Sequence, residues 1–149
     1  MTASSETGAP GRLEGRTILV VDDDPDILAS AGLALQVEGA EVVEAADGNT
    51  AVSLFLASDP DAVVLDMMLP RRSGFLVLEK IREHRATTPV VMVTANRGHR
   101  HHAYAENLGV SAYMVKPVPM SRLLDTLVDL LEAGRDQSSP PATEESPEP

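Results

Sequence analysis

The sequence predicts an α/β domain in which helices cover both faces of a five-stranded parallel sheet. Two observations predict it. Short runs of Val, Leu, Ile and Met recur without polar alternation, which is typical of strands buried on both faces. Segments with apolar residues at helical spacing separate these runs, and this alternation indicates a doubly wound sheet with right-handed crossovers. With 149 residues, the chain has the size of one domain.

Four of the five expected strands are continuous apolar runs, at residues 18–21, 62–65, 90–93 and, less purely, 113–115. The remaining strand, at residues 41–45, reads Glu-Val-Val-Glu-Ala and alternates polar with apolar residues. Such alternation is typical of an edge strand with one face in solvent.

Helices are expected between the strands and after the last one. The apolar stripes are Ile27, Ala31, Ala34 and Leu35 after Pro25; Ala51, Leu54 and Phe55 after Asp47-Gly48; Phe75, Leu78 and Ile81 after Gly74; and Leu123, Leu127, Leu130 and Leu131 after Pro119. A fifth helix is expected within residues 97–108, where the periodicity is weakest.

Both ends of the chain are expected to be disordered, because a charged segment with few apolar residues cannot offset the entropy of ordering. We predict a disordered segment at residues 1–15, one domain at 16–133, and a disordered acidic tail rich in Pro, Ser and Glu at 134–149. Binding of a partner by the tail is the alternative. No output domain is expected after Arg135, so the chain is either a stand-alone domain or a fragment of a longer protein.

Composition excludes several classes of function. The 23 acidic and 12 basic residues give a formal charge of -11, so we expect no direct DNA binding by this chain and no attraction to an anionic membrane. The absence of cysteine excludes disulfides, thiolate metal sites and thiol nucleophiles. No apolar stretch is long enough for a membrane span or resembles a secretion signal, which predicts a cytoplasmic protein.

Charged and polar residues stand where the expected strands end. They are Asp22, Asp23 and Asp24 after the first strand, Asp66 after the third, Thr94 after the fourth and Lys116 after the fifth. With the strand order 2-1-3-4-5, the first and third strands are neighbours and their acids converge beyond the carboxyl ends of the strands. Two carboxylates 4 Å apart repel by about 4 kcal/mol at an effective dielectric near 20, so the cluster needs a cation or a proton.

Oxygen ligands without His or Cys favour a hard ion, and a few carboxylates completed by water and a phosphoryl oxygen suit Mg²⁺ better than Ca²⁺. Lys116 then offers a positive charge, and Thr94 a hydroxyl, to a bound phosphate. Each residue also has a structural interpretation, because the triple Asp can cap the helix after Pro25, Thr94 can cap a helix, and Lys116 can lie at the surface. Their joint position at the strand ends favours a metal and phosphate site.

Four strings in this order carry a resemblance to a known family: ILVVDDDPD, VVLDMMLPRRSG, VMVTA and GVSAYMVKP. Over residues 16–133 the sequence resembles the receiver domain of two-component response regulators, of the stand-alone, chemotaxis-regulator-like type. The resemblance implies a flavodoxin-like fold. It also implies a signalling protein that catalyses only its own phosphorylation and dephosphorylation, and is not otherwise an enzyme.

By this resemblance Asp66 is the phosphoacceptor, which takes a phosphoryl group from a histidine of a sensor histidine kinase or a histidine phosphotransfer protein. Asp22 and Asp23 would hold Mg²⁺ together with Asp66 and the backbone carbonyl of Met68. Which two of the three consecutive aspartates bind the metal is open, although the string register favours the first two.

The resemblance also implies a switch. Lys116 would pair with the phosphate, Thr94 would move to bond it, and Tyr113 would turn inward. The surface of the fourth helix, fifth strand and fifth helix would then signal to a downstream protein target. The Lys116-Pro117 peptide is expected to be cis.

Several positions differ from the commonest family pattern or carry an open alternative. Val118 stands where an aromatic residue is frequent. Met68 and Asn96 occupy positions that tune hydrolysis of the aspartyl phosphate, and an apolar Met68 predicts slow hydrolysis. The remaining observations concern His99, His101 and His102, which form either a metal site or, more simply, a solvated helix face, and Arg71-Arg72, which either guide a phosphodonor or have no such role.

Three rival functions remain to be weighed. A haloacid-dehalogenase-like phosphatase also begins with Asp-x-Asp, as Asp22 and Asp24 could be, but it needs an acidic pair after Lys116 and leaves Asp66 unexplained. The second rival is an unphosphorylated receiver-like interaction module. The third, an FMN carrier, is disfavoured because no Ser/Thr/Gly-rich phosphate loop follows the first strand.

Overall fold

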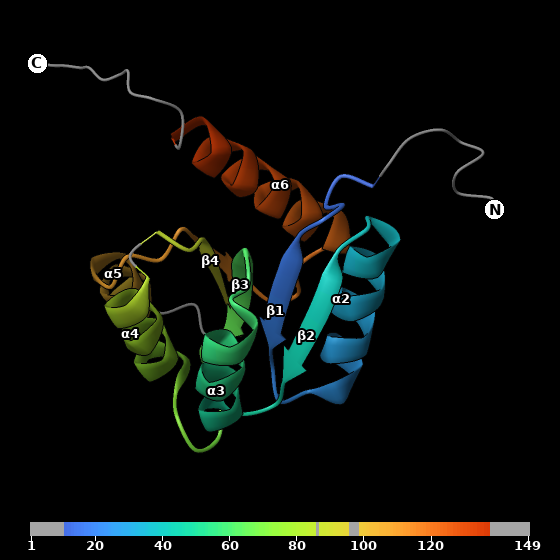
Figure 1. The fold of residues 1–149 in the computed structure, drawn as a ribbon. Coiled ribbons are helices and arrows are strands. Elements are labelled where there is room, and N and C mark those ends of the chain that lie inside the picture. The colour runs from blue at the N-terminus through green and yellow to red at the C-terminus, as the bar shows by residue number, and fades with distance from the viewer. Residues whose placement is uncertain (1–10, 86, 96–98, 138–149) are drawn as a thin grey trace, which may run out of the picture.

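The computed structural model describes residues 11–85, 87–95 and 99–137, which form one sheet flanked by helices (Figure 1). The strands are β1 (Thr17–Val21), β2 (Glu41–Ala45), β3 (Ala62–Asp66), β4 (Val90–Thr94) and β5 (Ala112–Val115); the helices are α2 (Pro25–Val37), α3 (Gly48–Ser58), α4 (Gly74–His84), α5 (His99–Asn107) and α6 (Met120–Gln137). Each expected strand and helix is present, including the weakly periodic α5.

The sheet has the order β2-β1-β3-β4-β5, and every neighbouring pair is parallel. This confirms the predicted doubly wound α/β fold. All residues of β3 and β4 are buried, as their continuous apolar sequence requires, whereas β2 is partly exposed at the edge of the sheet.

Two apolar layers hold the helices against the sheet, α2 and α6 on one face and α3, α4 and α5 on the other (Figure 1). Successive residues of β1 show how a continuous apolar strand serves both layers. Ile18 and Val20 pack in the α2/α6 layer, and Leu19 and Val21 pack in the opposite layer. Both faces of the sheet are thus covered by helices. Polar residues that act together are therefore expected at the carboxyl edge of the sheet.

Capping residues set the start of three helices close to that edge. The side chains of Asp24, Asp47 and Ser73 each accept a hydrogen bond from a backbone N–H in the first turn of α2, α3 and α4 respectively. Pro25 occupies the first turn of α2, where its missing N–H is not needed. The loops that leave β1 and β2 are therefore short.

The described structure extends past both ends of the predicted domain. Leu13 is only 1% exposed and belongs to the α2/α6 layer, where its N–H donates to the Glu38 carbonyl at 2.8 Å. Arg12 Nη2 lies 3.0 Å from Asp125 Oδ1 on α6. The boundary expected at residue 16 is thus too late, and the boundary at 133 is too early because α6 continues to Gln137. Residues 1–10 and 138–149, on which the rest of both disorder predictions falls, lie outside the described residues.

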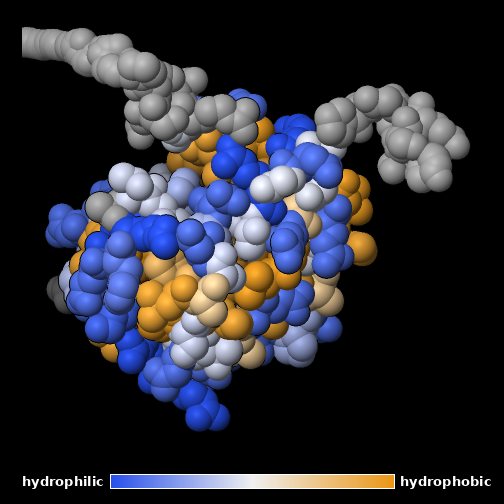
Figure 2. Space-filling view, in the orientation of Figure 1, coloured by the Kyte–Doolittle hydropathy of each residue, from blue (hydrophilic) through white to orange (hydrophobic). Residues whose placement is uncertain are grey.

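Hydrophobic surface on the face shown in Figure 2 lies between helices and at the edge of the view where α2 lies. On α2, Leu33 and Val37 are 65% and 73% exposed. The outer helix surfaces are otherwise largely hydrophilic in this view. Within the described ranges, no helix combines the length and apolar content needed to cross a membrane.

Candidate functional site

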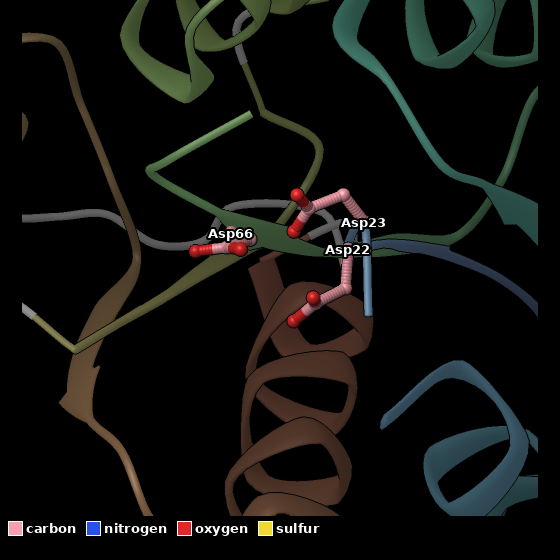
Figure 3. Close-up of side chains that lie close together, drawn as sticks. All are labelled: Asp22, Asp23 and Asp66. Atoms are coloured by element: carbon pink, nitrogen blue, oxygen red, sulfur yellow. The ribbon is translucent and has the colours of Figure 1, made fainter. Parts of the chain in front are cut away.

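Three carboxylates meet at the carboxyl edge of the sheet. Asp22 and Asp23 follow β1, Asp66 ends β3, and these two strands are hydrogen-bonded neighbours. One carboxylate oxygen from each residue lies within 4.8 Å of the others. Figure 3 shows the side chains of Asp22 and Asp23 next to one another after β1 and the side chain of Asp66 close beside them. We call Asp22, Asp23 and Asp66 the acid cluster; it forms where the strand order predicts it.

Burial divides the acid cluster into an inner and an outer part. Asp22 and Asp66 are 3% and 4% exposed, whereas Asp23 is exposed. Lys116 reaches the inner part, with its Nζ 2.8 Å from Asp22 Oδ2 and 3.4 Å from Asp66 Oδ2. One ammonium therefore faces two buried carboxylates, and the site keeps an excess of negative charge.

The pKa values follow from this arrangement. Burial raises the pKa of the Asp66 carboxyl, and the charge of Asp22 adds to the rise, while Lys116 and the Met68 N–H act against it. Burial acts to lower the pKa of Lys116, but its hydrogen bond to Asp22 and the charges of Asp66 and Asp22 outweigh this, so the pKa is raised above 10.5. Lys116 and the Met68 N–H therefore do not fully offset the cost of burying the ionised Asp66 carboxylate next to Asp22.

Backbone hydrogen bonds orient the two inner carboxylates. Asp22 Oδ1 accepts from the Asp24 N–H at 2.9 Å, and Asp66 Oδ1 accepts from the Met68 N–H at 3.2 Å. The Asp24 carboxylate instead caps α2 by accepting from the Asp26 N–H at 2.9 Å. The structure therefore brings Asp22 and Asp23, rather than Asp24, to Asp66, and capping explains the third aspartate.

The next two strand ends carry Thr94 and Lys116, of which Lys116 contacts the acid cluster. Thr94 is the last residue of β4 and is fully buried; its carbonyl accepts the Lys116 N–H at 2.7 Å. The Lys116-Pro117 peptide is cis, as predicted. Tyr113, on β5, is half-buried against the α3/α4/α5 layer, and burial raises the pKa of its hydroxyl.

The loop from β3 to α4 folds tightly over the end of β3. The Gly74 N–H donates to the Met67 carbonyl at 2.9 Å, and a Cβ on Gly74 would lie only 2.4 Å from the Asp66 carbonyl oxygen. Sequence reasoning did not assign Gly74 a role in the site, because the close approach of the Asp66 backbone has no local signature. Met68, in the same loop, is 62% exposed.

The two loop arginines contact the start of α3. Arg71 Nε lies 3.8 Å from Asp47 Oδ2, and Arg72 Nε donates to Asn49 Oδ1 at 3.1 Å. These contacts support a structural role for Arg72, while guidance of a phosphodonor by Arg71 stays a prediction. Asn96 lies outside the described residues, and at His99, His101 and His102 only the helical backbone is described, so the alternatives for these residues remain as stated.

The donor set fits a small divalent cation. Ligand oxygens about 2.1 Å from Mg²⁺ lie at most about 4.2 Å apart, and the three carboxylate oxygens of the acid cluster are already within 4.8 Å of one another. All three side chains offer carboxylate oxygens, which hard ions prefer, and their repulsion is relieved by a divalent charge. Asp22, Asp23 and Asp66 are therefore able to hold Mg²⁺ with small side-chain movements.

A parallel α/β domain with two buried acids, one directly after β1 and one at the end of β3, and a lysine after β5 is the class of protein that the resemblance to receiver domains implies. Residues 18–128 match the family described as the response regulator receiver domain. The chain belongs to this family. This finding confirms the resemblance and overturns the haloacid-dehalogenase-like and FMN-carrier alternatives.

Related proteins agree with the assignment. The chain is 40% identical over 126 residues to the transcriptional regulatory protein TcrA of Mycobacterium tuberculosis, covering 85% of this chain and 50% of TcrA. It is 34% identical to the DNA-binding dual master transcriptional regulator RpaA of Synechocystis, covering 76% of this chain and 48% of RpaA. The chain thus spans about half the length of these curated relatives.

Solved structures show the same fold. A CheY-like receiver domain protein of Methanospirillum hungatei superposes with a TM-score of 0.80 at 30% identity, covering 83% of this chain and 98% of that protein. The BeF3-activated receiver domain of DrrB gives a TM-score of 0.71 at 32% identity, covering 78% of this chain and 97% of the DrrB domain.

Asp23→Asn is expected to weaken Mg²⁺ binding about tenfold without lowering the stability of the metal-free protein, because Asp23 is exposed and supplies one charged ligand. Asp24→Asn is the matched control. It removes the adjacent charge, but Asn retains the cap of α2, so Mg²⁺ affinity should change little. Isothermal titration of both variants with MgCl₂ measures the difference; equal affinities would show that Asp23 is not a ligand.

Proposed function

We propose that the chain accepts a phosphoryl group on Asp66 from a phosphohistidine donor and signals through the changed surface of the domain. The observation that carries this proposal is the position of Asp66, which is 4% exposed at the end of β3 and lies beside the carboxylates of Asp22 and Asp23 and the ammonium of Lys116. No structural need explains two buried acids beside a third at the edge of an apolar sheet.

The chemical step is a displacement at phosphorus. A carboxylate oxygen of Asp66 forms a P–O bond while the bond from phosphorus to the donor breaks, P–N in phosphohistidine or P–O in acetyl phosphate. The departing histidine nitrogen takes a proton from solvent, and acetate leaves as the anion. Burial raises the pKa of Asp66, so positive charge at the site helps to keep its carboxylate ionised, which is the form that attacks phosphorus.

The surrounding side chains would position the group and balance its charge. Asp22, Asp23, Asp66 and the backbone carbonyl of Met68 would hold Mg²⁺, which when bound neutralises the oxygens of the transferring phosphoryl group. Lys116, already within 3.4 Å of Asp66 Oδ2, would pair with a phosphoryl oxygen on the product. Thr94 would donate its hydroxyl to another oxygen.

The sheet register supports a route from the site to the signalling surface. Thr94 pairs with Val115 on β5, and Tyr113 pairs with Met92 on β4. Tyr113 lies on the same edge strand, β5, two residues before Val115. A movement of Thr94 toward the phosphoryl group would therefore be transmitted through β5 to Tyr113. We propose the α5-β5-α6 surface as the contact for a downstream protein target, with a sensor histidine kinase or histidine phosphotransfer protein as donor.

Incubation with acetyl phosphate and Mg²⁺ tests the proposal. Intact-mass analysis should show one added phosphoryl group of about 80 Da, and peptide mapping should locate it on Asp66. Chelation of the metal with EDTA should prevent the labelling. Absence of the added mass under saturating donor would support the interaction-module alternative, in which the domain is never phosphorylated.

Met68→Asn is expected to speed loss of the phosphoryl group several-fold. Met68 is exposed beside the proposed acceptor and its thioether cannot orient an attacking water, whereas an amide can donate and accept hydrogen bonds. The decay of phosphorylated protein, followed by intact mass after removal of the donor, measures the rate. Met68→Leu is the matched control and should decay like the wild type; an unchanged or slower rate for the Asn variant would contradict the idea.

A further inference from the structure

A cavity of about 630 Å³ adjoins the acid cluster on the α2/α6 face of the sheet. It lies between the carboxyl ends of β1, β3 and β4, the first half of α2 and the start of α6. Its volume lies within the range of cavities that bind small organic molecules. The apolar walls include Val20, Ile27, Ala31, Val93, Val118 and Leu123.

The polar lining is mostly acidic. Asp22 and Asp66 lie at the end shared with the acid cluster, and Asp26 and Ser30 line the wall one turn apart on α2. Lys116 is the basic residue of the lining. Three carboxylates thus face one ammonium, which repels an anion and favours a cation, while the remaining walls favour a hydrocarbon body.

We propose that this cavity binds an amphipathic monovalent amine, with its apolar body between α2 and α6 and its ammonium group toward Asp22 and Asp26. Charge complementarity selects this occupant over a neutral or anionic one. The inference rests on the proposed function in one respect, because the bound ammonium and the proposed Mg²⁺ are both attracted by the negative charges of Asp22 and Asp66 and repel each other. Each therefore weakens binding of the other by the same factor, and the amine opposes phosphorylation.

Position 118 offers a way to fill the cavity by substitution. Val118 lines the cavity and is only half-buried, in the segment between the cis peptide and α6. An aromatic side chain at this position would add several carbons where the cavity lies. Val118→Phe is therefore a cavity-filling variant that leaves the acid cluster and Lys116 unchanged.

Calorimetric titration of the full, metal-free chain tests the proposal with three probes that share one apolar body: 4-phenylbutylamine, 4-phenylbutanol and 4-phenylbutyrate. We expect the amine to bind about tenfold more tightly than the alcohol, and the carboxylate not to bind. Saturating Mg²⁺ should weaken amine binding about tenfold. Equal binding of the three probes, or no effect of Mg²⁺, would overturn the proposal.

Two variants locate the site. Val118→Phe should weaken amine binding at least about tenfold, whereas Val118→Ala, which keeps the cavity open, should bind the amine within about twofold of wild type. Both should still be labelled by acetyl phosphate without amine, and this separates failure of the cavity proposal from failure of the proposed function. Undiminished binding to Val118→Phe would overturn the proposal. Failure of all three probes to bind would overturn it as well. If Val118→Phe then also blocked transfer from a phosphohistidine protein, the cavity would instead receive a side chain of that protein.

Discussion

Asp66→Asn is expected to abolish labelling by acetyl phosphate completely, because the amide has no anionic oxygen to form the acyl phosphate. The substitution preserves the size of the side chain at a position that is 4% exposed, so the loss will not come from a cavity or a clash. Intact-mass analysis of the variant, under conditions that label the wild type, measures the effect.

The same variant should be more stable than the wild type in metal-free buffer near neutral pH. Burial, with the charge of Asp22 adding to it, raises the pKa of Asp66 above 3.8, so the folded state binds a proton more tightly than the unfolded state. Folding stability therefore falls as pH rises from 3.8 through the folded pKa, and the loss persists at neutral pH. Asn carries no charge, so the variant does not incur this loss of stability. Thermal unfolding with and without Mg²⁺ should show a higher midpoint for the variant and a smaller gain from the metal.

Asp24→Asn is the control for both measurements. It removes one negative charge two residues from Asp22 but keeps the cap of α2, so labelling and metal response should remain. Labelling that persists in Asp66→Asn and maps to Asp22 or Asp23 would contradict the assignment of the acceptor. A lower melting midpoint for Asp66→Asn would instead show that its pair with Lys116 outweighs desolvation.

The strand pattern predicted that these side chains meet, because the order of parallel strands in a sheet determines which strand ends are neighbours. Lys116 and Asp22 are 94 positions apart, yet their side chains are joined at 2.8 Å. Both follow apolar runs, and parallel strands place such positions at one edge of the sheet. The string register favoured Asp22 and Asp23 as the pair that faces Asp66, and the structure brings these two to it. The strand pattern alone could not separate them from Asp24, because a helix cap and a carboxylate of the site require the same residue type and only backbone direction distinguishes them.

Other features had no local signal. Leu13 is a single apolar residue among polar neighbours, and only its contacts with α2 and α6 show that it belongs to the core. The extension of α6 to Gln137 adds turns to an existing helix, which costs far less than nucleation, so composition alone placed the end too early. The cavity beside Val118 depends on how α2 and α6 approach the sheet, which no short motif encodes.

Lys116→Met is expected to destabilise the metal-free protein by about 3 kcal/mol near neutral pH, because it leaves Asp22 and Asp66 buried together without a counter-charge. The pKa of Lys116 is raised above 10.5, so its stabilising charge is fully present at neutral pH in the wild type and is lost only as pH rises through the folded pKa. Urea denaturation of wild type and variant measures the difference.

Two conditions should reduce the deficit of Lys116→Met, and together they distinguish lost charge from lost packing. Acidification favours the protonated form of Asp66, because burial already raises its pKa and the lysine that opposed this rise is absent, so its repulsion of Asp22 decreases. Saturating Mg²⁺ supplies the missing positive charge. Labelling by acetyl phosphate should nevertheless stay about 100-fold slower, because the metal cannot replace the donor to the phosphoryl oxygen.

Lys80→Met is the matched control, since Lys80 is the other lysine of the sequence and pairs with Glu83 at 3.2 Å on the exposed face of α4. Exposed pairs of this kind contribute about 0–1 kcal/mol, so its stability and labelling should remain close to wild type under every condition. A deficit in Lys116→Met that neither acid nor Mg²⁺ reduces would mean that the stem of Lys116 stabilises the domain by packing. The acid cluster would then tolerate its own charge, and the electrostatic argument for a metal site would lose its main support.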